Sequence, residues 1–337
     1  MKKIFSIILF VLFNIYNSQS LTVLSEKTNL PLTKVLIFGK NGDILATSDI
    51  DGKIDRQLLN SDQEKFNLVH ENISLGTFSY DEINKDIIKL NDRIKDIEQV
   101  IIKNNKPAKY ILIKGNFNTY VTLNNRLNCY LDGIITYVFD NKTKKLKTSH
   151  VEQYRIFRLE SAKNDKKQTG SWDYESFLDL PKLKKIGNIE EYKVKNTRIK
   201  ELKGIKKDEI EISGEAFQEK PLNFLGYKAF DSKTIMNISY EKDSEKTLRD
   251  FIESNEIWFV KFKHKTESNY NQIIAHRNFY PIELDFSNND DIGRKVKLNK
   301  NNSNYTSNYW QDAAFPNMQG IFASFFKDDL KEKENKK

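Results

Sequence analysis

Short apolar runs separated by turn-forming residues dominate the first hundred positions. Lys34–Phe38 is a β-branched and aromatic run, Asn41-Gly42 follows it, and Ile44–Thr47 resumes the apolar pattern. Asn-Gly supplies the positive φ angles of a tight type I′ hairpin turn. Asp51-Gly52 gives a second turn signal ten residues later, directly before the next apolar position at Ile54. Closely spaced turns between short apolar runs predict an antiparallel β-sandwich.

After a polar linker at Asn104–Pro107, the apolar pattern predicts longer strands and two short helices. The expected strands are Tyr110–Ile113, Phe117–Leu123, Leu127–Phe139, Val151–Leu159, Ile235–Ile238, Glu256–Lys265, Ile273-Ile274 and Ile282–Phe286. The expected helices are Asp173–Leu180 and Ser244–Phe251. Gly133 is expected at a bulge or bend. The prediction is a mainly β chain with a sandwich at 21–103, an antiparallel α+β domain at 108–326 and a disordered charged tail at 327–337.

Residues 1–20 have the pattern of a secretory signal peptide. Lys2-Lys3 precede an apolar run at Ile4–Ile15, and Ser18 and Ser20 offer small residues for cleavage before Leu21. The apolar run is shorter than a membrane-spanning helix, so the prediction is an exported protein. A retained membrane anchor is the alternative.

Composition changes this picture in three respects. The 337 residues are too many for one small sandwich, and 38% are hydrophobic, so two domains with real cores are expected. The net charge is +8, but basic and acidic residues are interleaved, which is typical of a solvated surface and not of a nucleic-acid partner. Cys129 is the single cysteine, so no internal disulfide forms. Its place in the alternating run Leu127, Cys129, Leu131 predicts a buried structural residue.

The N-terminal pattern resembles the carboxypeptidase regulatory-like domain, a prealbumin-type β-sandwich. The resemblance lies in Pro31-Leu32, Val35–Ile37, Asn41-Gly42 and the turn Ser48–Ile54, where Ile54 stands in place of the usual Phe. Asp86–Leu90 and Asp96–Ile102 are similar to the last strand of that domain and to its exit segment. The resemblance implies a fold more than a function, because such folds host many activities. It also implies an envelope protein of Bacteroidota-type bacteria, in the periplasm or at the outer membrane.

The second half resembles the lipoprotein-carrier fold in the order of its elements. A broad meander comes first, helices follow, and a long aromatic strand with its partners comes last. In that fold a half-open sheet is plugged by helices and holds acyl chains. Asn271–His276 stands where such sequences carry a Gly-x-Ile-x-Ile-Asp strand, and it lacks the Gly and the Asp.

Few residues of the chain have the types and spacing of a catalytic or metal site. His264-x-x-Glu267, with His276 nine residues later, has the residue types of a zinc peptidase site. The favoured interpretation is that this spacing arises by chance and that His264 is an ordinary strand residue. Asp49, Asp51 and Asp55 lack the spacing of a calcium loop and are interpreted as turn residues.

Two further pairs have residue types found in catalytic sites. Cys129 and His150 lack an orienting third group for thiol catalysis, and Asp290-Asp291 follow two Asn in a turn. No catalytic, cofactor-binding or metal-binding residue is therefore assigned, and no cofactor is expected.

The favoured function is non-enzymatic: an exported envelope protein that binds or assembles with an unidentified envelope partner, associated with the outer membrane. One alternative is a carrier of a hydrophobic or lipid ligand, which predicts an aromatic-lined apolar cavity of about 300 Å³ or more in the second domain. The other alternative is a hydrolase, which requires His264, Glu267 and His276 to converge in a cleft.

Overall fold

The computed structural model describes residues 20–49, 51–59, 62–92, 101–102, 108–162, 174–183, 186, 189, 196–204, 207–289, 294–312, 315 and 317–336. The predicted signal peptide up to residue 19, the linker up to Pro107 and the Asp290-Asp291 pair lie outside the described residues. The chain forms two compact units, residues 1–95 and residues 96–337.

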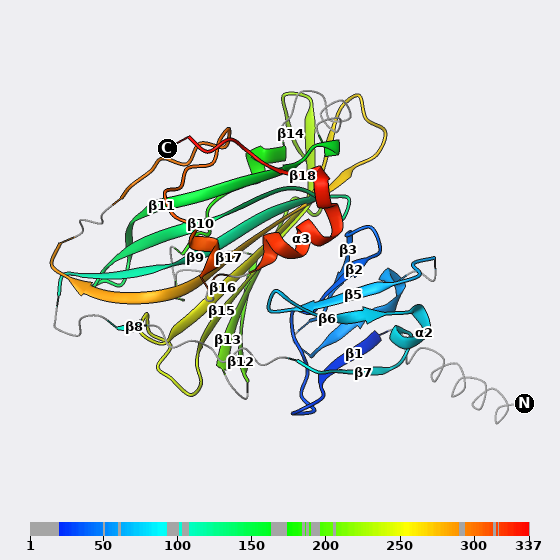
Figure 1. Cartoon of the computed structure of the whole chain (residues 1–337), viewed down its shortest axis with the longest axis horizontal. Helices are drawn as coiled ribbons and strands as arrows, with labels where there is room; N and C mark the ends of the chain where they lie inside the picture. The colour runs from blue at the N-terminus through cyan, green and yellow to red at the C-terminus, as the bar shows by residue number, and fades with distance from the viewer. Residues whose placement is uncertain are drawn as a thin grey trace, which may run out of the picture. The chain divides into compact units, whose positions relative to one another are not determined.

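The first unit contains two small sheets. Its strands are β1 (Ser20–Ser25), β2 (Leu36–Gly39), β3 (Ile44–Thr47), β4 (Lys53–Asp55), β5 (Phe66–His70), β6 (Ile73–Phe78) and β7 (Ile87–Leu90), with the 3-10 turn η1 (Arg56–Leu58) and the helix α2 (Tyr80–Ile83). The sheet orders are β4-β1-β7 and β3-β2-β5-β6 (Figure 1). Apolar residues of both sheets, including Val23, Ile37 and Phe66, share one core. The two sheets therefore pack as layers over common apolar side chains.

Turns form at both predicted places in the first unit, but the first is not the predicted type I′ turn, because Gly42 has a positive φ and Asn41 does not. Gly42 has a φ of +80° between the antiparallel strands β2 and β3, a conformation that glycine adopts without strain. Gly52 has a φ of +69°. Ahead of it, Asp49 Oδ1 accepts hydrogen bonds from the backbone N–H groups of Asp51 and Lys53 at 2.9 and 2.7 Å. The Asp49 carboxylate is thus used within the turn itself.

The second unit is built on one large sheet. Its strands are β8 (Ile101–Ile102), β9 (Tyr110–Leu123), β10 (Arg126–Asp140), β11 (Leu146–Leu159), β12 (Thr197–Lys203), β13 (Lys207–Ala216), β14 (Leu222–Phe224), β15 (Tyr227–Glu241), β16 (Phe251–His264), β17 (Asn271–Ser287) and β18 (Leu330–Glu332). The other elements are the 3-10 turns η3 (Tyr174–Phe177), η5 (Tyr309–Gln311) and η6 (Lys327–Asp329) and the helix α3 (Met318–Phe326). The sheet has 11 strands, with the main order β12-β13-β15-β16-β17-β9-β10-β11-β18. β14 pairs with β15, and β8 adds to β17 in parallel. A mainly β fold is therefore confirmed, and the large sheet is antiparallel apart from β8. The first unit departs from the predicted antiparallel sandwich, because β1 and β7 pair in parallel.

Several predicted boundaries were wrong. Tyr110–Ile113 and Phe117–Leu123 form the single strand β9, because Gly115 between them lets the backbone of β17 approach: a Cβ there would lie 2.2 Å from Tyr280 O. Ile273-Ile274 and Ile282–Phe286 are likewise parts of the one strand β17. Ile101-Ile102, predicted to close the first domain, pair instead with β17 of the second unit.

The predicted helix at Ser244–Phe251 is absent from the structure, where this segment forms turns before β16. The Thr247 backbone N–H and hydroxyl both donate to Asp250 Oδ2, at 2.8 and 2.9 Å, and such local bonds compete with helical ones. The helix predicted at Asp173–Leu180 reduces to the single turn η3. Leu330–Glu332 in the predicted disordered tail form β18, which pairs with β11 because Leu330 buries its side chain there.

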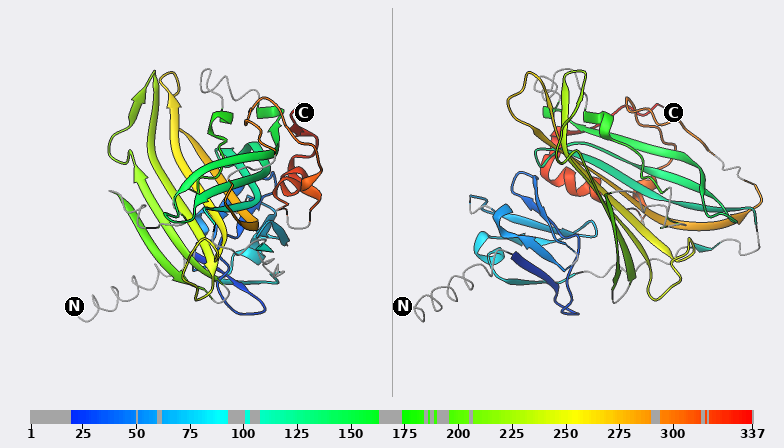
Figure 2. Two further views of the ribbon diagram at one scale, coloured as in Figure 1. Left: turned by 90° about the vertical axis from the view of Figure 1, so that its left-hand side faces the viewer. Right: turned by 180° about the vertical axis from the view of Figure 1, so that it is seen from behind.

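The large sheet is strongly curved, and its two faces are covered differently (Figure 2). One face carries the main apolar core and is covered by a segment here called the strap, defined as the described residues 174–183, 186 and 189. On the other face, here called the helix face, Phe322 of α3 packs against Tyr120 and Tyr130, with ring centroids 5.1 and 6.0 Å apart. Among the described residues, no helix has the length and apolar character needed to cross a bilayer.

Candidate functional site

The three residues of the zinc hypothesis do not come together. His264 ends β16, and its backbone N–H donates to Glu267 Oε2 at 2.7 Å. His276 pairs with Ile257, seven residues from His264 along β16, which corresponds to about 23 Å. His276 is buried on the helix face and stacks on Tyr120 with centroids 4.3 Å apart. The described residues contain no group of three or more His, Cys, Asp or Glu placed to hold a metal ion.

The thiol and imidazole of the second hypothesis are also far apart. Cys129 and His150 lie on the neighbouring strands β10 and β11, but Cys129 pairs with Arg158 and His150 with Thr136. This register separates them by seven residues, again about 23 Å. Cys129 is fully buried in the main core, which confirms the structural role predicted for it.

The strap side of the sheet instead gathers aromatic rings at one end. Phe177 of the strap lies 5.4 Å from Trp258 and 6.0 Å from Phe262 of β16 (centroid distances), and Tyr227 stacks on Phe262 at 5.2 Å and 13°. Phe177, Tyr227, Trp258 and Phe262 are here called the aromatic cluster. Phe262 is buried and the other three are half-buried. Alternation along β16 explains the placement, since Trp258 and Phe262 are an even number of residues apart and share one face.

Two tyrosine hydroxyls attach the strap to the sheet. Tyr137 of β10 donates to Pro181 O at 2.7 Å, and Tyr240 of β15 donates to Ile186 O at 3.1 Å. Burial raises the pKa of Tyr137 well above its usual value, so the phenol keeps its proton and remains a donor. The strap thus spans the face from β10 to β15.

A buried carboxylate fixes the start of the strap. Glu175 Oε1 accepts from Arg158 Nη1 at 3.1 Å, and its Oε2 accepts from Lys333 Nζ at 2.6 Å. Lys300 Nζ also donates to Ser176 O at 3.0 Å. Within the described residues, the strap is joined to the strands by side-chain bonds and ring contacts, since no part of it belongs to the sheet ladder.

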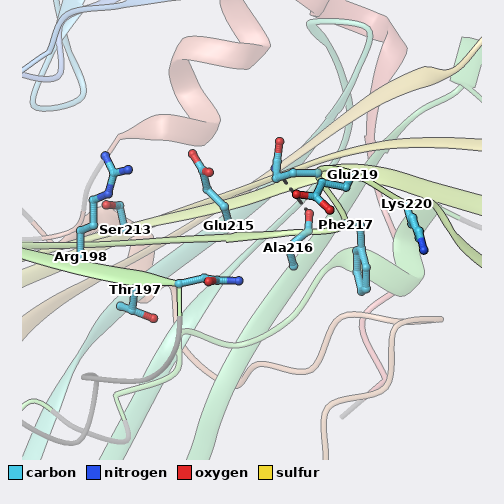
Figure 3. A pocket seen from close by; sticks show the side chains of 10 residues that line it. Thr197, Arg198, Ser213, Glu215, Ala216, Phe217, Glu219 and Lys220 are labelled. Carbon is cyan, nitrogen blue, oxygen red and sulfur yellow. Dashed lines mark hydrogen bonds between the residues drawn. The ribbon is translucent and has the colours of Figure 1, made fainter.

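A pocket of about 860 Å³ lies beside this end of the sheet (Figure 3). It is lined by Asn196, Thr197, Arg198, Ser213, Glu215, Ala216, Phe217, Gln218, Glu219 and Lys220. Gln218 Nε2 donates to Ser232 O at 3.2 Å, and Ser232 Oγ accepts from Trp258 Nε1 at 3.1 Å, so the pocket adjoins the aromatic cluster. Eight of its ten lining residues are polar or charged, and Phe217 is the one aromatic residue among them. This pocket is therefore not the aromatic-lined cavity predicted for a carrier.

Only half of the aromatic cluster is visible in the sequence. The aromatic strand containing Trp258 and Phe262 was recognised by its composition. Phe177 and Tyr227 were missed because they meet that strand through the strap and the sheet register, far apart in sequence. The run Leu222–Tyr227, apolar around a Leu-Gly turn, was the available signal.

Comparison with known proteins gives little information about the family of this chain. No protein-family model matches the chain, and no curated protein matches it. Among solved structures, one entitled "Lipid-protein interactions in lipovitellin" matches with 10% sequence identity and a TM-score of 0.27, over 57% of this chain and 27% of that chain. The chain thus spans about a quarter of the length of lipovitellin. A likeness this distant carries no argument about function.

Proposed function

We propose that this protein is a non-enzymatic binding protein whose large sheet receives a hydrophobic or lipid ligand beneath the strap. The observation that carries the proposal is the position of Phe177. This side chain of the strap lies against Trp258 and Phe262, on the apolar face of the sheet. A strap held by side-chain contacts occupies the place that an acyl chain would take.

The free energy lost when Phe177 leaves the sheet is comparable to the free energy gained when an acyl chain takes its place. Phe177 is half-buried, so withdrawing it from its ring contacts costs at most about 1.5–3 kcal/mol of apolar burial. Each methylene of a ligand buried in its place returns about 0.8 kcal/mol, so roughly four methylenes offset the loss. The strap backbone is held on both sides of Phe177, by the ion pairs of Glu175 and by the hydrogen bond from Tyr137 to Pro181 O. The Phe177 side chain, and not the strap backbone, is therefore the part proposed to move.

The lipoprotein-carrier resemblance supports this proposal with one departure. A single curved sheet with an apolar face and a plugging segment agrees with that fold. In the described residues, however, the plug is the strap with its turn η3, whereas the helix α3 packs on the opposite face of the sheet.

The first unit supports the second part of the proposal, that the protein is an exported envelope protein with a carboxypeptidase regulatory-like domain. Seven strands in two sheets share one core, and Asn41-Gly42 and Asp51-Gly52 form the turns that this resemblance requires. In this proposal the first unit contacts an envelope partner and the second holds the ligand.

Titration with the fluorescent fatty acid cis-parinaric acid tests the ligand site. Trp258→Ala should weaken binding about tenfold or more, because it removes one wall of the aromatic cluster. Phe177→Ala should strengthen binding of the fatty acid, because the strap then competes less well with it for the apolar face of the sheet. Trp310→Ala is the matched control, since Trp310 lies on the helix face against Arg155. Absence of probe binding to the wild type, or equal effects of the two tryptophan variants, would refute the proposal.

A further inference from the structure

The hairpin that joins β14 to β15 ends in exposed apolar side chains. Leu222, Phe224 and Leu225 expose 49%, 63% and 79% of their surface, and nearby Phe217 exposes 39%. Figure 1 shows this hairpin at one end of the large sheet, projecting beside the turn between β16 and β17. Large apolar side chains gathered at one exposed place mark an interaction site.

The conformation of the turn presents these side chains outward. Leu225 and Gly226 both have positive φ angles, +47° and +84°, as in a tight two-residue hairpin turn. A leucine in this conformation is strained, because its Cβ crowds the backbone. With most of its surface exposed, Leu225 gains almost no burial in return. The strain and the exposure together indicate that the contact of Leu225 lies outside the chain.

Lysines outnumber carboxylates in the segments next to the tip. The segments 217–233 and 261–270 adjoin there, because the Lys265 backbone N–H donates to Gly226 O at 2.8 Å. They contain six lysines and three carboxylates: Lys220, Lys228, Lys233, Lys261, Lys263 and Lys265 against Glu219, Asp231 and Glu267. Asp231 pairs with Lys233 and Lys261 at 3.3 and 2.8 Å. The other four lysines outnumber the two remaining carboxylates, so the base of the hairpin has a net positive charge.

We propose that the β14–β15 hairpin docks this protein onto an anionic lipid bilayer. Leu222, Phe224 and Leu225 enter the acyl boundary, and Lys220, Lys228 and Lys265 contact the headgroups. An apolar tip with lysines set behind it matches the depth profile of a bilayer interface, where lysine stems pack among apolar groups and the ammonium reaches the surface. Each lysine near an anionic surface contributes roughly a fivefold gain in affinity.

The shape of the site favours a bilayer over a protein partner. The tip is a narrow projection of adjacent residues, and a bilayer accepts such a projection without a complementary pocket. The aromatic cluster begins directly behind it, since Phe224 pairs with Tyr227 across the hairpin. Docking would therefore bring the proposed ligand site to the membrane surface. The inference itself does not depend on ligand binding, and the two are measured separately.

Vesicle flotation of the chain from Ser20 onward, which contains every described helix and strand, tests the proposal. The wild type should float with vesicles containing 30% phosphatidylglycerol in phosphatidylcholine, and at least tenfold less with phosphatidylcholine alone. The triple variant Leu222→Ser/Phe224→Ser/Leu225→Ser should lose at least tenfold in partitioning, as should Lys220→Glu/Lys228→Glu/Lys265→Glu. Leu58→Ser/Ile87→Ser is the matched control, because these first-unit side chains expose 51% and 53% of their surface.

A second measurement reports whether the tip enters the bilayer and does not depend on how much protein floats with the vesicles. In a Phe224→Trp variant, tryptophan emission should shift to shorter wavelength on addition of anionic vesicles, whereas a Leu58→Trp variant should show no shift. Equal flotation of the wild type and the tip variant would overturn the proposal. So would a wild type that ignores vesicles but forms a dimer that the tip variant abolishes, because the tip would then be a protein interface.

Discussion

Asp132 and Arg155 face each other on β10 and β11 and form a bidentate ion pair inside the protein. Arg155 Nε and Nη2 donate to the two oxygens of Asp132 at 3.1 and 2.7 Å, and the carboxylate is fully buried. Tyr309 donates its hydroxyl to the same carboxylate at 2.7 Å, and the Trp310 ring lies 4.0 Å from the guanidinium. The pair thus fixes the C-terminal segment on the helix face.

Removing one partner of this pair should be strongly destabilising. Arg155→Met leaves the buried Asp132 charge without its counterion, and such losses cost about 3–5 kcal/mol. The denaturant midpoint of the second unit, followed by circular dichroism, measures this. The double variant Asp132→Leu/Arg155→Met should recover much of the loss, because no buried charge remains. A single variant within 1 kcal/mol of the wild type would contradict the structural role assigned to the pair.

The C-terminal residues should be needed for stability. Deleting residues 330–337 removes β18 and the Lys333 ammonium that pairs with the buried Glu175 of the strap at 2.6 Å. We expect the melting temperature of the second unit to fall by several degrees, since the deletion also leaves the Glu175 charge with one partner fewer. Deleting only residue 337 is the control and should leave the melting temperature unchanged. A disordered tail, by contrast, would predict no effect for either deletion.

Gly133 should not tolerate a side chain. A Cβ at this position would lie 2.3 Å from Gln153 O and 2.8 Å from Phe117 Cε1. Gly133→Ala should therefore cost about 1–3 kcal/mol through displacement of the strand and the ring. Gly214→Ala is the matched control, because the nearest atoms to its Cβ are 3.9 Å away. Unfolding in urea compares the two, and equal costs would show that the close approach is unimportant.

His276 should make the protein less stable in mild acid. Burial, with the nearby charge of Arg277, lowers the pKa of His276 to about 3 from 6.5. The unfolded chain binds a proton below pH 6.5 that the folded chain does not bind until about pH 3, so stability falls as the pH decreases through this window. The expected loss is about 2 kcal/mol at pH 5.

His276→Phe should remove that loss while keeping a ring stacked on Tyr120. The comparison is the change in unfolding free energy between pH 7.5 and pH 5 for the two proteins. The variant should show about 2 kcal/mol less acid destabilisation than the wild type. Identical pH dependence in both would show that His276 does not carry this effect.

The sequence alone determined the local structure of the first unit and the class of the second. Asn41-Gly42 and Asp51-Gly52 specify turns through backbone preference, a property of a few adjacent residues, and the alternating apolar run around Cys129 specifies a strand. The sequence also argued against the zinc and thiol hypotheses, because four histidines and one cysteine provide few combinations of metal ligands or catalytic groups.

Tertiary structure decided the rest, because register, curvature and coverage depend on residues far apart in sequence. Pairing of β16 with β17 places His264 and His276 about 23 Å apart, which no spacing along the chain reveals. Phe177 joins Trp258 only because the strap crosses the sheet, and Leu330 orders the tail only because β11 offers an edge. Local backbone preference determines turns and strands. The aromatic cluster and the exposed hairpin depend instead on how the strands of the large sheet pair and on where the strap crosses it.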